Sequence, residues 1–241
     1  MITFLRRIRK SWIESGNARK YILYALGEIA LLVIGILIAL KIHNWNEERK
    51  NQALEQVLLQ EINEEFKYNL SEFENNLHQY DIVRIQLQKI IHSFPIDPKV
   101  INVDTFAETL ELIHFQGDYD MSVTAISKLK STSSLDIISN QELRSLLIEW
   151  EVLASDYQIT ETQAVKFHQE KFAPLMYEKL SRPYASGLKD PRVDLQFLGS
   201  LEFEGLIKFK FRRVENLFRS VRMEPNIVTV MKRIIELSQN E

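Results

Sequence analysis

The chain has no cysteine and very little glycine or proline, with 7 Gly and 6 Pro among 241 residues. The lack of cysteine excludes disulfides, Cys-ligated zinc, iron–sulfur clusters and thiol catalysis. It does not identify the compartment, because a stable helical domain needs no disulfide in an oxidising space. The shortage of glycine and proline argues against all-β folds and Gly-rich phosphate loops. A hydrophobic content of 45% excludes a wholly disordered chain.

The common catalytic and metal-binding motifs are also missing from the sequence. No Walker phosphate loop, GxGxxG, HExxH, GxSxG or EF-hand pattern is present. His114 precedes Asp118 and Asp120, but a polar turn explains this group better than a metal site. Glu61 and Glu65 lie four residues apart, and without a Glu-x-x-His motif elsewhere a solvated helix face is favoured. We therefore predict no enzymatic activity, no metal site and no cofactor.

One stretch, residues 21–42, is apolar enough and long enough to cross a bilayer, which requires about 20 residues. It is interrupted by Glu28 and ends near Lys41, whose ammonium can reach the interface. Trp45 follows at a position typical of tryptophans at the membrane interface. The alternative is a cleaved signal peptide, but no small-x-small cleavage site follows before Lys41. The sequence thus predicts a retained single-pass anchor.

Basic residues are more frequent before the span than directly after it. Six precede it (Arg6, Arg7, Arg9, Lys10, Arg19 and Lys20) and three follow it closely (Lys41, Arg49 and Lys50). This excess predicts a cytoplasmic N-terminus under the positive-inside rule. Residues 43–241 would then lie outside the cytoplasm, in the periplasm of a bacterium whose inner membrane holds the span.

Residues 1–20 form a short basic segment with an amphipathic pattern. On a helix, Met1, Phe4, Leu5, Ile8 and Trp12 would share about one third of the circumference. The rest of the circumference carries the basic residues Arg6, Arg7, Arg9 and Lys10. This pattern predicts an interfacial helix with Trp12 in the lipid and the basic side chains at anionic headgroups, the alternative being a disordered tail.

Glu28 lies about seven residues inside the span, roughly 10 Å below its cytoplasmic end. An ionisable group at that depth is costly and usually faces protein or water. Its helix face also carries Tyr24, Gly35 and Ala39, and the last two form a small-xxx-small pair that lets helices approach closely. The pattern predicts a packing face for self-association or for a membrane partner. Contact with a proton pathway and simple snorkelling to the headgroups are the alternatives.

Two stretches resemble a known protein family. GEIALLVIGILIALKIHNWNEERK (27–50) resembles the N-terminal segment shared by a family of uncharacterised single-pass membrane proteins common in Bacteroidota. TAISKLKSTSSLDIISNQELRSLL (124–147) is similar to their mid-domain stretch, although Ile126 and Ser133–Ser134 replace the usual Tyr and Ser-Gly. The resemblance implies a domain of unknown function, and so an architecture and a lineage but no chemistry.

The chain beyond the span predicts long amphipathic helices. Residues 54–94 carry apolar side chains at steps of three or four, and Pro95 ends this pattern. Further helices are expected at about 105–114, 122–130, 139–175 and 201–237, with capping boxes at 105–108 and 139–142, a kink near Pro174 and an interruption at Pro225. The prediction is an all-α fold with one transmembrane helix and an elongated, extracytoplasmic antiparallel helical bundle over residues 43–241, as one domain. Its first helix should reach about residue 94.

A basic region with interleaved phenylalanines lies between residues 208 and 222. It begins with Lys208, Lys210, Arg212 and Arg213. Nucleic acid binding is implausible on the predicted side of the membrane, so we expect contact with the acidic first helix or a surface for a partner or anionic lipid.

These features predict a non-enzymatic, membrane-anchored scaffold or accessory subunit of a cell-envelope assembly. Its partners would be the lipid bilayer and either further copies of the chain or another inner-membrane protein. The alternative is an extracytoplasmic ligand-sensing helical bundle that signals through a partner membrane protein.

Overall fold

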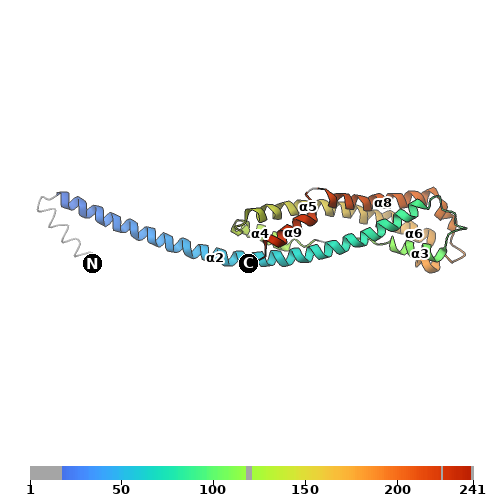
Figure 1. The fold of residues 1–241 in the computed structure, drawn as a ribbon, viewed down its shortest axis with the longest axis horizontal. Helices are drawn as coiled ribbons and strands as arrows, with labels where there is room; N and C mark the ends of the chain where they lie inside the picture. Colours follow the sequence, from blue (N-terminus) through green and yellow to red (C-terminus); the bar gives the residue numbers. More distant parts are fainter. Residues whose placement is uncertain (1–17, 118–120, 224, 240–241) are drawn as a thin grey trace. The chain divides into compact units, whose positions relative to one another are not determined.

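The computed structural model describes residues 18–117, 121–223 and 225–239, and this part of the chain contains helices and no strand. The all-helical prediction is therefore confirmed for these residues. The chain divides into two compact units, residues 1–55 and 56–241, and helix α2 (Ala18–His92) belongs to both. Figure 1 shows the order of the helices along the chain.

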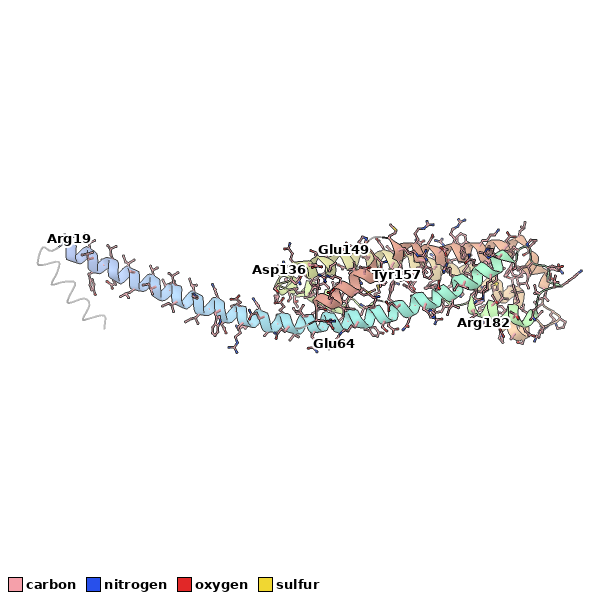
Figure 2. The ribbon with its side chains drawn as sticks, in the orientation of Figure 1. Arg19, Glu64, Asp136, Glu149, Tyr157 and Arg182 are labelled. Atoms are coloured by element: carbon pink, nitrogen blue, oxygen red, sulfur yellow. The ribbon has the colours of Figure 1, made fainter. Side chains whose placement is uncertain are left out.

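The first unit consists, where it is described, of α2 up to Glu55. Apolar side chains from Ile22 to Ile42 are exposed on all sides of this helix, as Figure 2 shows beyond Arg19. Within the described residues, α2 is the one helix long and apolar enough to cross a membrane, and none of its apolar window is buried. This confirms one long apolar N-terminal helix and supports a membrane anchor.

In the second unit, α2 continues with one face buried. Leu58, Ile62, Phe66, Phe73 and Tyr80 lie on this face at steps of four or seven residues, and all are nearly inaccessible. The helix ends at His92, where a turn from Ser93 to Ile90 precedes Pro95. The helix thus ends two residues before the expected end near residue 94.

Ten further helical segments follow α2 in the described residues. They are α3 (Val103–Leu112), α4 (Thr124–Ser131), the 3₁₀ turn η1 (Ser134–Ile137), α5 (Gln141–Phe167), the π-helical turn η2 (His168–Phe172), α6 (Ala173–Leu180), α7 (Tyr184–Gly187), the 3₁₀ turn η3 (Leu195–Gly199), α8 (Leu201–Arg222) and α9 (Ile227–Leu237). The break between α8 and α9 is the interruption expected at Pro225. The kink expected near Pro174 takes the form of the π-helical turn, and Pro174 lies in the first turn of α6.

Helix caps differ from those that the sequence patterns predict. The side chain of Asn102 accepts a hydrogen bond from Thr105 N, so the cap of α3 lies three residues before the expected capping residue Thr105. Asn140, and not Ser139, caps α5 by accepting from Leu143 N at 3.0 Å. Asparagine is as good an N-cap as serine, so the residue that the packing places at the helix start takes the role.

The core of the second unit lies between α2 and the later helices. α5 packs against α8 and α9, and Figure 1 shows all three alongside the second part of α2. Aromatic rings join α2 to α5: Phe66 meets Trp150 and Phe73 meets Tyr157 edge-on, each with 4.8 Å between ring centroids. Such edge-to-face pairs contribute about 0.5–1.5 kcal/mol beyond their burial.

Three buried asparagines on α2 fix the neighbouring segments. Asn63 donates to the carbonyl of Ile235 in α9 at 2.8 Å. Asn69 exchanges two hydrogen bonds with the backbone of Ser122, just before α4, at 2.8 and 2.9 Å. Asn76 bonds to α5. A buried amide that lost its partner would cost about 1–3 kcal/mol, so these bonds favour one register of the helices over others.

Candidate functional site

The predicted packing face of the span is exposed in the first unit. Glu28, Gly35 and Ala39 are all exposed, and Tyr24 is partly buried. A Cβ placed on Gly35 would meet no atom within 4 Å, so a second helix could approach closely there. Trp45 is 63% exposed. The other predicted interface residues, Arg6, Arg7, Arg9, Lys10 and Trp12, lie outside the described residues.

The predicted basic surface of α8 needs one correction. Lys208 and Arg212 are exposed and Arg213 is partly buried, but Lys210 is only 4% exposed. Lys210 lies three residues after Ile207 and four before Val214, on the apolar stripe that α8 turns toward the core. The structure thus removes Lys210 from any partner surface and places it in a buried polar cluster.

In this cluster Lys210 contacts groups from two other segments, the π-helical turn η2 and the chain that follows α3. Its Nζ lies 2.6 Å from Nδ1 of His168 and donates to the carbonyl of Phe115 at 3.4 Å. The ammonium also lies 4.3 Å from the centroid of the Phe172 ring, within the range of a cation–π contact. When Lys210 is protonated it donates this bond, and a neutral His168 accepts at Nδ1 with its own proton on Nε2.

His114 forms the other half of the buried cluster. Its Nε2 makes a short hydrogen bond with the hydroxyl of Tyr184, and its ring lies 5.4 Å from that of His168. The ring of Tyr177 stacks on the His114 ring, with 5.5 Å between the ring centroids. In the described part of the chain, Nδ1 of His114 has no hydrogen-bond partner.

The cluster is electrostatically unusual because it holds three basic groups away from water. Burial lowers the pKa of His114 and that of His168 to about 3, and each is lowered further by the positive charge of Lys210. Burial also lowers the pKa of Lys210 to about 7. Both imidazoles are therefore neutral at neutral pH, and the Lys210 side chain gains or loses its proton there.

A second buried polar group consists of Asn76 on α2 with Tyr157 and Glu161 on α5. Glu161 lies seven residues before His168 on the same helix face. Asn76 donates to Glu161 at 2.7 Å and to the hydroxyl of Tyr157 at 3.2 Å. Burial raises the pKa of Tyr157, so this phenol stays protonated. A Cβ at Gly117 would lie 2.1 Å from the Glu161 carboxylate and 2.6 Å from the Tyr80 hydroxyl, so a larger residue there would displace these side chains.

Between the two groups lies a small cavity of about 10 Å³, lined in part by Tyr80, Gln116, His168, Lys210 and Arg213. A cavity of this size holds about one water molecule. Gln116 Oε1 and Arg213 Nε border it as a buried acceptor and donor without a protein partner. The arrangement can bind a water and exchange a proton, but it has no space for an organic substrate.

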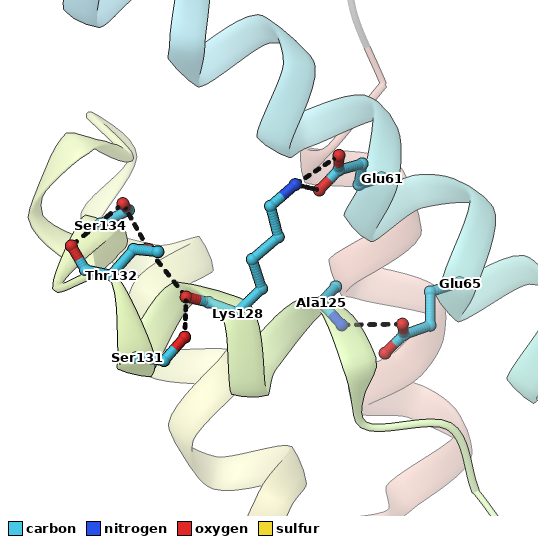
Figure 3. A network of polar contacts seen from close by, with 7 residues as sticks. All are labelled: Glu61, Glu65, Ala125, Lys128, Ser131, Thr132 and Ser134. Carbon is cyan, nitrogen blue, oxygen red and sulfur yellow. Dashed lines mark hydrogen bonds and ion pairs between the residues drawn. The ribbon is translucent and has the colours of Figure 1, made fainter.

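Glu61 and Glu65 of α2 hold the start of α4 (Figure 3). Glu65 accepts from the backbone N–H of Ala125 at 2.8 Å, in the first turn of α4, where a carboxylate also meets the positive end of the helix dipole. Glu61 accepts from Lys128 at 2.6 and 2.7 Å. The expected solvated face is thus wrong for Glu65, which has a buried carboxylate oxygen, whereas Glu61 makes its ion pair at the exposed surface. The described residues contain no group of three or more His, Cys, Asp or Glu able to hold a metal ion.

One larger pocket, of about 430 Å³, opens between the end of α2 and α3. Its lining includes Pro95, Ile96, Val100, Ile101 and Phe106. The polar groups beside them bond locally, as Asn102 does to Thr105 N. The pocket therefore presents mainly apolar surface.

Sequence reasoning missed the buried cluster because its members come from distant segments without motif spacing. Two signals were present. Lys210 interrupts the apolar stripe of α8 at a core position, and His168 continues the buried series of α5 from Tyr157 through Glu161 and Ala164. A polar residue at a core position of an amphipathic helix is buried and needs a partner.

Comparison with known proteins places the chain in a family. Residues 28–157, more than half of the chain, match the model of a family of unknown function, DUF6090. The chain belongs to this family. The DUF6090 match includes most of both stretches on which the sequence resemblance rested, and it confirms an uncharacterised domain. It covers His114 but ends before His168 and Lys210. No curated protein and no solved structure matches the chain.

Proposed function

We propose that the protein is a non-enzymatic, membrane-anchored scaffold or accessory subunit of a cell-envelope assembly. In this proposal the span crosses the inner membrane with its N-terminus in the cytoplasm, and residues 43–241 form a periplasmic antiparallel helical bundle. The contacts of α5 with α8 and α9 support the bundle, and the excess of basic residues before the span supports the orientation. The Bacteroidota lineage stays a prediction.

One observation carries the proposal. α2 is a single helix of 75 residues, and it contains both an apolar segment that none of the described residues covers and the residues at the centre of the second unit's core. A soluble protein rarely exposes such a continuous apolar surface. Lipid or another transmembrane helix would cover it.

The face of Glu28, Gly35 and Ala39 is the proposed contact between spans. Gly35 offers the space for close approach, and Glu28, exposed on the isolated helix, would hydrogen-bond across the contact. The contact joins two copies of the chain or one copy and another inner-membrane protein.

The mass of the full-length protein in mild detergent tests this proposal. We expect an integer multiple of the chain mass of 28.3 kDa or a stoichiometric complex with a second membrane protein. Gly35→Leu and Glu28→Leu should dissociate the complex, whereas Glu28→Gln should preserve it because an amide still hydrogen-bonds. A wild-type monomer without a partner would contradict the proposal, and a loss of function in Glu28→Gln with assembly intact would favour proton coupling.

The sensor remains the second candidate, and the pocket near Pro95 is the observation that favours it. Its 430 Å³ lies within the range of small-molecule sites, and its lining is mainly apolar. A ligand bound there would raise the thermal unfolding temperature of the full chain. Ile101→Trp should fill the pocket and cancel that rise, and a rise that survives this change would place the ligand elsewhere.

A further inference from the structure

Helix α5 has a second apolar face, opposite the one it buries. Its buried residues are Leu143, Leu147, Trp150, Ala154, Tyr157, Glu161 and Ala164. On the other side Ile148, Val152 and Ile159 are 52%, 59% and 56% exposed. At about 100° per residue these three lie within roughly 40° of one another, and roughly opposite Tyr157. We call them the outer stripe of α5.

The outer stripe has the spacing of a helix–helix contact. Its members are separated by four and seven residues, with the small residue Ser155 between Val152 and Ile159. Single exposed apolar residues are common on protein surfaces and need no explanation. Three β-branched side chains aligned over about 16 Å form a ridge of the kind that packs between the side chains of a facing helix.

Carboxylates flank the outer stripe on both sides. Glu149 and Asp156 lie on one side and Glu151 lies on the other, and residues 148–159 contain no lysine or arginine. Glu151 pairs with Lys130 of α4. In the described part of the chain, neither Glu149 nor Asp156 has an ion-pair partner. The ridge is therefore apolar at its centre and acidic at its edge.

We propose that the outer stripe of α5 binds an amphipathic α-helix of another protein, whose apolar ridge is flanked by lysine or arginine. Charge complementarity selects this partner. A second α5 would place Glu149, Glu151 and Asp156 against the same carboxylates, and like charges at the flanks of paired helices destabilise the pair. An anionic lipid surface would repel the same residues.

The inference adds a partner class to the proposed accessory subunit, but it does not rest on the packing face of the span. The packing face of the span and the outer stripe of α5 lie in different units of the chain, so an experiment can refute one contact without refuting the other. Loss of assembly in Gly35→Leu reports on the span, whereas the experiment below reports on α5.

Site-specific photo-crosslinking in native membranes tests the outer stripe. p-Benzoylphenylalanine replaces Val152 in the full-length chain, and the matched control carries it at Tyr68, which is 59% exposed on α2. We expect an adduct with a second protein from position 152 and not from position 68. Mass spectrometry should map the adduct to a segment with apolar residues at steps of three or four between basic residues. An adduct with the chain itself, with lipid alone or with a segment of other chemistry would overturn the inference, as would no adduct.

Charge reversal at the flank separates this contact from nonspecific apolar contact. Glu149→Lys combined with Asp156→Lys should lower the yield of the Val152 adduct by at least about fivefold, because two attractive pairs become repulsive. Glu64→Lys, an exposed change of the same type on α2, should leave the yield unchanged. Both variants should fold because all three substituted positions are at the surface. Circular dichroism checks this. An unchanged yield in the double variant would overturn the charge complementarity and with it the proposed partner.

Discussion

Lys210 is a cationic residue at a core position, and its environment determines how it affects stability. Its ordinary pKa of 10.5 falls to about 7 in the folded protein because burial penalises the charged ammonium. Between pH 7 and 10.5 the unfolded chain therefore holds a proton that the folded chain has released. The free energy of unfolding rises with pH across this window, and below pH 7 the folded state carries the full cost of the buried charge.

Replacing Lys210 by methionine removes this cost. We expect Lys210→Met to be more stable than the wild type at pH 6, by about 1–4 kcal/mol, as when other buried charged groups are replaced by apolar ones. The difference should shrink toward pH 10, where the wild-type lysine is neutral in the folded state. Urea unfolding at both pH values measures this, with the exposed Lys208→Met as control. A variant destabilised equally at both pH values would show that the hydrogen bond to His168 outweighs the buried charge.

The two buried histidines predict a loss of stability in acid. Each has a folded-state pKa of about 3 against an ordinary value of 6.5, so the unfolded chain binds more protons between these values. The free energy of unfolding should fall as the pH drops from 6.5 toward 3. Each histidine contributes up to about 1.4 kcal/mol per pH unit.

Removing one histidine tests its share of this slope. His114→Gln keeps a hydrogen-bonding group near Tyr184 but cannot be protonated. We expect its unfolding free energy to vary less with pH between 4 and 6 than that of the wild type. His78→Gln, an exposed change on α2, is the control and should keep the wild-type slope. Equal slopes in all three proteins would contradict the low pKa of His114.

At the scale of the elements, the helices were largely predictable from the sequence and their partners were not. Helix ends follow local signals such as Pro95 and the break at Pro225, and those signals are read from neighbouring residues. The buried cluster depends on tertiary packing, which brings His114, His168 and Lys210 together across 54 and 42 residues of chain. Periodicity shows that a position is buried, but it does not show what faces it.

The acidic residues of α2 also show that periodicity does not identify the partner of a side chain. They lead to a prediction for α4. Glu65→Ala should destabilise the second unit by about 1–3 kcal/mol, because the N–H of Ala125 loses its acceptor at the start of the helix. Glu65→Gln should recover part of the loss, since the amide oxygen still accepts. Glu64→Ala on the exposed side should change stability by less than about 0.5 kcal/mol.

Thermal unfolding followed by circular dichroism compares these three variants. Equal effects of Glu65→Ala and Glu64→Ala would mean that the bond to Ala125 contributes nothing and that α4 is held by its apolar face alone.

At the scale of the whole molecule, the structure joins two chemically different parts through one helix. The first part exposes a stretch of apolar side chains that is interrupted by Glu28, whereas the second buries a core and carries exposed charges on its surface. This difference in solvent preference is the physical basis for an anchored protein. The side of the membrane on which each part lies can therefore be measured.

The absence of cysteine allows a topology test without background labelling. We expect Ser127→Cys, exposed on α4, to react with a membrane-impermeant maleimide in cells whose outer membrane has been opened. Ser15→Cys should react only after the inner membrane is broken, because the basic segment before the span favours the cytoplasm. Ala30→Cys, within the span and away from the Glu28 face, is the control and should react only in detergent. The opposite pattern at Ser127 and Ser15 would invert the orientation, and reaction of Ala30→Cys in intact membranes would show that the apolar segment does not cross the bilayer.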